Sequence, residues 1–141
     1  MDMELLKNLV DYGVIVLLLF MSFIAVMLFI ERLFFYRKID VNRYKNKKQL
    51  DIALTKNLTF IGTIASNSPY IGLLGTVLAI MLTFMTMSAG DIEATKIMSS
   101  LALALKATAV GLVVAIVSMV FYNILSRTAE ILESDYENKE V

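Results

Sequence analysis

The sequence predicts an all-α membrane protein with three transmembrane helices, of which the second and third extend beyond the bilayer. The chain of 141 residues is 58% hydrophobic and only 18% charged, and its mean hydropathy is +0.73. Soluble domains are usually about 45–50% apolar and about 25% charged. The excess is concentrated in three long runs without a charged residue, each long enough to cross a bilayer.

The first uncharged run, residues 12–30, is expected to form span one. At about 1.5 Å per residue it covers roughly 28 Å, close to a hydrocarbon core of about 30 Å. An acidic flank precedes it, and Glu31-Arg32 follow without a small-residue cleavage site, so the run is not a cleaved signal peptide. Residues 1–11 are expected to be an outer leader that lies along the membrane surface or frays.

The second uncharged run, residues 57–90, is longer than a bilayer requires, and Pro69 divides it. Proline suits the first turn of a helix, and Asn67 or Ser68 is able to cap that turn. We therefore place span two at residues 69–87. Residues 51–66 are expected to be a helical extension in the cytoplasm, either continuous with span two or kinked at the proline.

The third uncharged run covers residues 107–126, but its apolar pattern begins at Ile97 with only Lys106 inside it. We place span three at residues 97–126, after an outer loop at 88–96. The helix is expected to begin near residue 95 and to continue into a tail at 127–141.

Basic residues predict the orientation. Eight of the thirteen lie within residues 31–56, so the segment 31–68 is expected in the cytoplasm, with the N-terminus outside and the C-terminus inside. Its basic side chains would face anionic lipid headgroups. In the tail, Glu130, Glu133 and Glu137 recur at steps of three and four. This acidic stripe is expected either to be solvated or to pair with the basic segment of its own or a neighbouring subunit.

Small residues form one stripe on span two and another on span three, with steps of four and three that place each set on one helical face. The stripes are Gly72, Thr76, Ala79, Thr83, Thr86 and Gly90, and Ala104, Thr108, Gly111, Ala115, Ser118 and Tyr122. Such faces serve close helix packing, or they line a cavity filled by water or by another helix. Both interpretations predict an assembly, because one chain supplies too few neighbouring helices.

Composition argues against an enzyme and against a bound cofactor or metal. Without cysteine or histidine the chain has no thiolate nucleophile, no imidazole base and no common zinc site. The net charge of zero does not indicate nucleic-acid binding. The three uncharged runs also lack Asp and Glu, which a proton relay in a membrane usually needs. If protons are transported, a partner is expected to bring the carboxylate.

The motifs GLLGTV at residues 72–77 and ATAVGL at residues 107–112, in this order on separate spans, resemble the signature of the ExbB/TolQ/MotA proton-channel family. The resemblance covers spans two and three, about half of the chain. It implies a homo-oligomeric ring, expected to be a pentamer, around a central pore lined by these two spans. It also implies two ExbD-like single-span partners inside the pore, each with an intramembrane Asp, and a TonB-like protein that passes movement to outer-membrane transporters.

The family's pore-facing threonines fall on Thr76 and Thr108, and those residues are expected to border the proton path. The other residues expected to line it are Thr83, Gly72, Gly111, Ala115 and Ser118. Two positions depart from the family pattern. Leu103 stands where many members have glutamate, and Lys106 stands where the residue is usually apolar.

Lys106 is expected to extend to the headgroups or to pair with Asp91, Glu93 or an acidic group of the partner. Glu31 is expected to form a local ion pair with Arg32 at the inner membrane edge, or alternatively to act as a gate.

The resemblance favours an ExbB-type scaffold of a proton-motive-force-driven motor in a bacterial inner (cytoplasmic) membrane, which energises TonB-dependent outer-membrane transport. The nearest alternative is a TolQ-type subunit of the Tol-Pal envelope system. MotA is a poorer match, because it has four spans and a large cytoplasmic domain. From other classes, a partner-independent passive or tension-gated channel and a purely structural anchor remain open.

Overall fold

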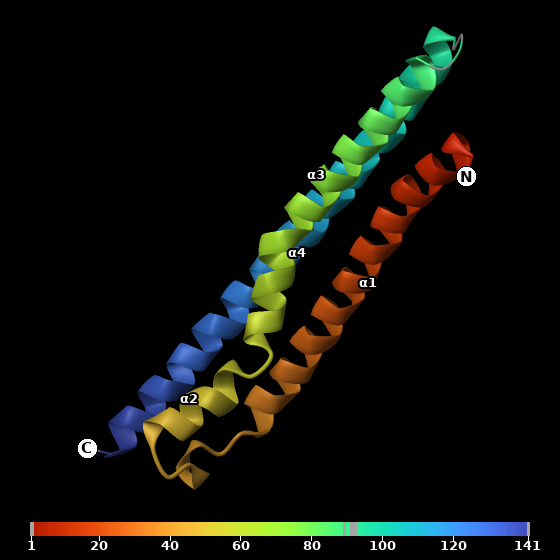
Figure 1. Cartoon of the computed structure of the whole chain (residues 1–141). Helices are drawn as coiled ribbons and strands as arrows, with labels where there is room; N and C mark the ends of the chain where they lie inside the picture. The colour runs from red at the N-terminus through yellow and green to blue at the C-terminus, as the bar shows by residue number, and fades with distance from the viewer. Residues whose placement is uncertain (1, 89, 91–92, 141) are drawn as a thin grey trace.

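The described residues, 2–88, 90 and 93–140 of a computed structural model, form four α-helices and one short 3₁₀ helix. In chain order these are α1 (Met3–Lys38), η1 (Val41–Arg43), α2 (Lys47–Thr55), α3 (Leu58–Ser88) and α4 (Ala94–Glu140). α1, α3 and α4 run side by side along one axis (Figure 1). The N-terminus lies toward the end where α3 finishes, and α2 and the C-terminus lie at the other end.

Three of these helices are long and apolar enough to cross a membrane, namely α1, α3 and α4. They contain 36, 31 and 47 residues. At about 1.5 Å per residue they measure roughly 54, 46 and 70 Å, whereas the hydrocarbon core is about 30 Å thick. The prediction of three spanning helices is confirmed, and span one is extended as well as spans two and three.

The N-terminal segment differs from its prediction, because residues 3–11 continue the helix of span one. The Asp2 side chain accepts a hydrogen bond from the Glu4 backbone N–H at 3.4 Å, which caps the first turn. No proline follows before α1 ends at Lys38. The leader is therefore neither a separate surface segment nor a frayed end.

The prediction of one helix over residues 51–66 is also wrong, since the chain breaks between α2 and α3. Asn57 has a backbone φ of 69°, a left-handed conformation that Asn tolerates better than most residues. The break turns α2 away from the axis of α3, so that Leu50 and Leu54 pack with Ile61 and Leu125 in a buried apolar cluster. A continuous helix would leave this apolar face of α2 uncovered.

Pro69 lies inside α3 and does not begin a helix, which corrects the predicted cap. The Ser68 hydroxyl donates to the Ile64 carbonyl oxygen at 2.5 Å, and the Asn67 amide donates to Thr63 at 2.9 Å. Both side chains thus bond within the helix, and α3 passes through the proline, as membrane helices often do. α4 begins at Ala94 and runs into the tail, as predicted.

Two buried clusters hold the bundle together. One is the cluster around Leu50 and Leu54 of α2, which lies at the end of the bundle that holds the C-terminus (Figure 1). The other lies along the middle of the helices, where Leu18 and Ala25 of α1 meet Ile64 of α3 and Val114 of α4. Large apolar side chains on the outer faces of all three long helices stay exposed, which suits contact with lipid or with further subunits.

Candidate functional site

The small-residue stripes predicted on spans two and three meet each other where α3 packs on α4. A Cβ atom added to Gly72 would lie 2.6 Å from the Ala107 carbonyl oxygen, and one added to Gly111 would lie 2.6 Å from that of Ser68. Real Cβ contacts are essentially never shorter than 3.0 Å. Only glycine fits at both positions without a shift of backbone, so the two helices approach as closely as small residues allow.

Thr76 and Thr108, here called the threonine pair, face each other one turn beyond these glycines, and their hydroxyl oxygens are in hydrogen-bonding contact. The Thr76 hydroxyl donates across the interface to the Ala104 carbonyl oxygen at 2.8 Å and lies 3.2 Å from the Gly72 carbonyl oxygen. The Thr108 hydroxyl lies 3.5 Å from the same Gly72 oxygen. The pair therefore binds α3 to α4 through polar contacts within an otherwise apolar segment.

The chemistry of the threonine pair is that of uncharged donors and acceptors. Each hydroxyl has one proton to donate and two lone pairs, and it does not ionise at physiological pH. Thr76 is 6% exposed, whereas Thr108 is partly exposed. Thr108 can therefore present its oxygen to a water molecule or to a protonated carboxyl group from outside the subunit. The pair can orient a proton carrier, but it cannot carry a net proton itself.

The remaining residues of the predicted proton path are distributed along the same α3–α4 contact. Thr83 is buried two turns from Thr76, and its hydroxyl donates to the Ala79 carbonyl oxygen at 2.9 Å. Ala115 and Ser118 are buried on α4, on the other side of the glycines. Within one subunit these side chains pack between helices. That they border a pore shared by several subunits stays a prediction.

A second polar group surrounds the buried guanidinium of Arg32 in α1, which is 2% exposed. It donates to both carboxylate oxygens of Glu31 at 2.6 and 2.7 Å, and to the Ala53 carbonyl oxygen at 2.8 Å. The Asn57 side chain donates to Glu31 at 3.4 Å. The predicted ion pair between Glu31 and Arg32 is thus present, and it ties α1 to α2 and to the start of α3. A gating role of Glu31 stays a prediction.

Lys106 is exposed on α4 and forms no ion pair with any residue that the structure describes. One predicted partner, Glu93, does not contact it, and another, Asp91, lies outside the described residues. An extension of Lys106 to the headgroups stays a prediction. Leu103, the other departure from the family pattern, lines a pocket near the N-terminal end of the bundle.

The acidic tail contacts the basic segment of its own chain. Lys47 of α2 forms an ion pair with Glu137 of α4. The hydrogen bond with this carboxylate raises the pKa of Lys47 above its ordinary value of 10.5. Nearby, the Tyr136 hydroxyl donates to the Tyr44 carbonyl oxygen at 3.2 Å. One of the predicted arrangements of the tail is therefore present within a single chain.

Asp11, the last residue of the expected leader, is a buried polar residue that the sequence pattern did not reveal. Asp11 is only 2% exposed and lies on the face of α1 that packs on the other helices. The buried residues Asp11, Leu18, Ala25 and Arg32 follow one another at steps of seven. Because seven residues make nearly two turns, this repeat marks one face. A repeat search that crossed the ends of the uncharged run would have found it.

The described residues contain no group of three or more carboxylate side chains that could hold a metal ion, and the sequence has no histidine or cysteine to add to one. The threonine pair and the glycine contact beside it therefore remain the features of the bundle's middle that most resemble a functional site.

Comparisons with known proteins match the same region and most of the chain. A model of the MotA/TolQ/ExbB proton channel family matches residues 20–138. The chain is 52% identical over 136 residues to the biopolymer transport protein ExbB of Aquifex aeolicus, covering 96% of this chain and 92% of that one. It is 47% identical over 136 residues to the ExbB of Helicobacter pylori, covering 96% and 94%. It is 46% identical over 88 residues to the Tol-Pal system protein TolQ of Haemophilus influenzae, covering 61% and 38%.

Proposed function

Because the chain belongs to the MotA/TolQ/ExbB proton channel family, we propose that it is the ExbB-type scaffold of a proton-motive-force-driven motor that energises TonB-dependent outer-membrane transport. The identity of about half over nearly the whole chain supports the ExbB type. Two proteins named ExbB match nearly end to end, whereas the match to TolQ covers 38% of that protein. A TolQ-type role in the Tol-Pal system is the second candidate, and the 46% identity of that shorter match supports it.

The single observation that carries the mechanism is the threonine pair in a membrane segment without acidic residues. Residues 12–30, 69–87 and 107–126 contain no Asp, Glu or His. Thr76 and Thr108 place two hydroxyls there, and these hydroxyls bond each other and two backbone carbonyl groups. We infer that an ExbD-like partner supplies a protonatable Asp, and that the pair orients this carboxyl group or a water beside it.

The close contact of α3 and α4 gives this pair a rigid support. At Gly72 and Gly111 the backbones pack closely, so a rotation that brought a larger side chain into this contact would bring it against main-chain atoms. Fixed dipoles stabilise a proton-transfer step most when they need not rearrange as the proton arrives. We propose that several copies, five by the family resemblance, place their threonine pairs around one pore that holds the ExbD-like helices.

Exposed apolar faces support the assembly. Large side chains of α3 and α4, among them Leu73, Phe84 and Ile116, are uncovered in a single chain. Some of these faces would meet neighbouring subunits and the rest would meet lipid. We place the chain in the inner membrane of a bacterium as a multi-pass protein, with the N-terminus in the periplasm and the C-terminus in the cytoplasm.

Valine at the threonine positions tests the mechanism, because Thr76→Val and Thr108→Val keep the shape but remove the hydroxyl. We expect each variant to assemble normally. Proton-driven transport in cells that hold the ExbD-like and TonB-like partners should fall at least about tenfold, because the rate-limiting transition state loses about one strong hydrogen bond. Energised uptake and the oligomeric state of the purified complex are measured in parallel.

Thr63→Val is the matched control. Thr63 is exposed on α3 and its hydroxyl donates only within the helix, to the Thr59 carbonyl oxygen at 2.7 Å. It should keep full transport. If both threonine-pair variants transport normally, the two hydroxyls have only a structural role in the α3–α4 contact. Steady proton conductance by the purified chain without a partner would instead support the partner-independent channel.

A further inference from the structure

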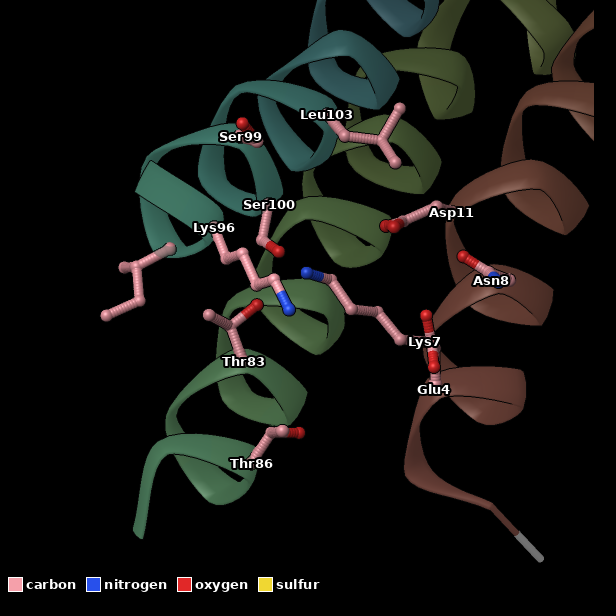
Figure 2. A pocket seen from close by; sticks show the side chains of 11 residues that line it. Glu4, Lys7, Asn8, Asp11, Thr83, Thr86, Lys96, Ser99, Ser100 and Leu103 are labelled. Atoms are coloured by element: carbon pink, nitrogen blue, oxygen red, sulfur yellow. The ribbon is translucent and has the colours of Figure 1, made fainter. Parts of the chain in front are cut away.

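A polar pocket of about 370 Å³ lies between α1, α3 and α4 near the N-terminal end of the bundle (Figure 2). α1 contributes Lys7 and Asp11, α3 contributes Thr83, and α4 contributes Lys96 and Ser100. Charged groups of both signs therefore converge on one space at the end of three membrane helices. Neither member of the threonine pair lines this pocket, although Thr83, a residue of the predicted proton path, does.

Asp11 is the residue of this pocket that most needs a ligand. The side chain is 2% exposed, and among the residues that the structure describes none donates a hydrogen bond to either carboxylate oxygen. The charge of Lys7, one turn earlier on α1, acts on it only through space. A buried carboxylate is strongly unfavourable unless a cation or hydrogen-bond donors meet it. Unless protonation neutralises Asp11, a positively charged donor beside it is what would stabilise the carboxylate.

Two lysines bring positive charge to the same pocket, and an anion there would be attracted to both. Lys7 reaches into the pocket from α1 and Lys96 from α4, and their ammonium groups point toward each other (Figure 2). In the described part of the chain neither forms an ion pair. Two ammonium groups that converge without an anion repel each other, whereas an anion between them accepts charge-assisted hydrogen bonds from both. Glu4 also lines the pocket, but it is exposed at the rim.

We propose that this pocket binds the headgroup of phosphatidylethanolamine, with the phosphate between Lys7 and Lys96 and the ammonium group on Asp11. One zwitterion satisfies all three side chains. A free phosphate would leave Asp11 unpaired, and a metal cation would be repelled by both lysines. The hydroxyl of Ser100 offers a further hydrogen bond to a phosphate oxygen.

Space for the lipid tail supports a lipid over a soluble zwitterion. An apolar cavity of about 330 Å³ lies deeper along α1 and α4, lined by Leu19 and Val113 among others. Leu19 is eight residues after Asp11, about 12 Å along the helix. An acyl chain extending about 12 Å from the headgroup would reach the depth of this cavity. The bound lipid would join α1 to α4, and this role is independent of the TonB-dependent function proposed above.

Native mass spectrometry of the full-length protein tests the proposal. The purified protein is incubated with equal amounts of phosphatidylethanolamine, phosphatidylglycerol and phosphatidylcholine of the same acyl chains. We expect about tenfold preference for phosphatidylethanolamine over both others, the change that one charge-assisted hydrogen bond provides. Phosphatidylglycerol has no ammonium group, and the trimethylammonium group of phosphatidylcholine has no N–H to donate to Asp11.

Variants separate the two halves of the site. Asp11→Asn should abolish the preference for phosphatidylethanolamine over phosphatidylcholine, and Lys96→Gln should lower the retention of both. Asp2→Asn makes the same charge change on the same helix outside the pocket, keeps a capping residue, and should behave as the wild type. Lys96 is exposed, so Lys96→Gln remains informative if Asp11→Asn fails to fold. Equal retention of the three lipids by the wild type, a preference for phosphatidylglycerol, or unchanged retention in Lys96→Gln would overturn the proposal.

Discussion

Alanine at Gly111 should destabilise the protein, although alanine is the better helix former. The added Cβ atom would lie 2.6 Å from the Ser68 carbonyl oxygen and 3.1 Å from the Cα atom of Gly72. Ordinary contact begins at 3.4 Å, so α3 and α4 must separate by about 0.8 Å at this point. All the obstructing atoms belong to the backbone, which has no rotamer to change.

The magnitude follows from two opposing effects. Overpacking in a tight contact costs about 1–3 kcal/mol, and replacing glycine by alanine inside a helix returns up to about 1 kcal/mol. We therefore expect Gly111→Ala to lower the free energy of unfolding by up to about 2 kcal/mol. The control is Gly13→Ala in α1, where nothing lies within 4 Å of the new Cβ atom. That change should raise stability by about 0.5–1 kcal/mol.

Equilibrium unfolding of the two variants in the same lipid bicelles measures this difference. Because Gly72 and Gly111 touch, the double variant Gly72→Ala/Gly111→Ala should also be non-additive, the first separation of the helices having already made room for the second methyl group. If Gly111→Ala is as stabilising as Gly13→Ala, the backbones are not in contact at this point, and the rigid support inferred for the threonine pair is refuted.

Two further predictions concern the C-terminal end of the bundle. Arg32→Met should lower the free energy of unfolding by about 1–2 kcal/mol, because the Ala53 carbonyl oxygen loses its buried donor, whereas Glu31 is partly exposed and water can solvate it. Thermal unfolding in detergent measures this loss, and a loss below about 0.5 kcal/mol would contradict the bonding described. The pKa of Lys47 is raised in the folded protein, so its pairing with Glu137 stabilises below its ordinary pKa of 10.5 and is lost as the pH rises through the higher folded value. Stability measured from pH 9 upward should accordingly fall more steeply for the wild type than for Lys47→Gln, and parallel curves would argue against the pairing.

The sequence was sufficient to predict the three membrane helices, because an uncharged run of about twenty residues has few other stable structures. Steps of three and four also placed Thr76 and Thr108 on faces suited to close packing, but the two faces were expected to need neighbouring subunits, whereas they cover each other within one chain. What the stripes could not distinguish is packing from a pore lining, because both use small and hydroxylated residues. One subunit shows the packing, and the pore requires the neighbours.

The errors at Asn57 and Pro69 have a common physical origin. A proline is a strong local signal, so a capped first turn was predicted there beside the alternative of a continuous helix, and side-chain hydrogen bonds and neighbouring helices let α3 continue through it. The real boundary falls at Asn57, where the gain comes from burying Leu50 and Leu54 against distant parts of the chain. Stabilisation by contacts between distant parts of the chain is hard to predict from the local sequence pattern. Asp11 was missed because the absence of charge was used to delimit span one.

The glycine contact between α3 and α4 has a mechanical consequence for the proposed ring. The close glycine contact and the hydrogen bond of Thr76 to the Ala104 carbonyl oxygen favour movement of α3 and α4 together, as one hairpin. A ring of such hairpins would change its pore diameter at the contacts between subunits. Any change in pore diameter during a power stroke would therefore be taken up between subunits, by tilting of whole hairpins, and the roughly 70 Å of α4 would convert a small tilt in the membrane into a larger sweep of its cytoplasmic end.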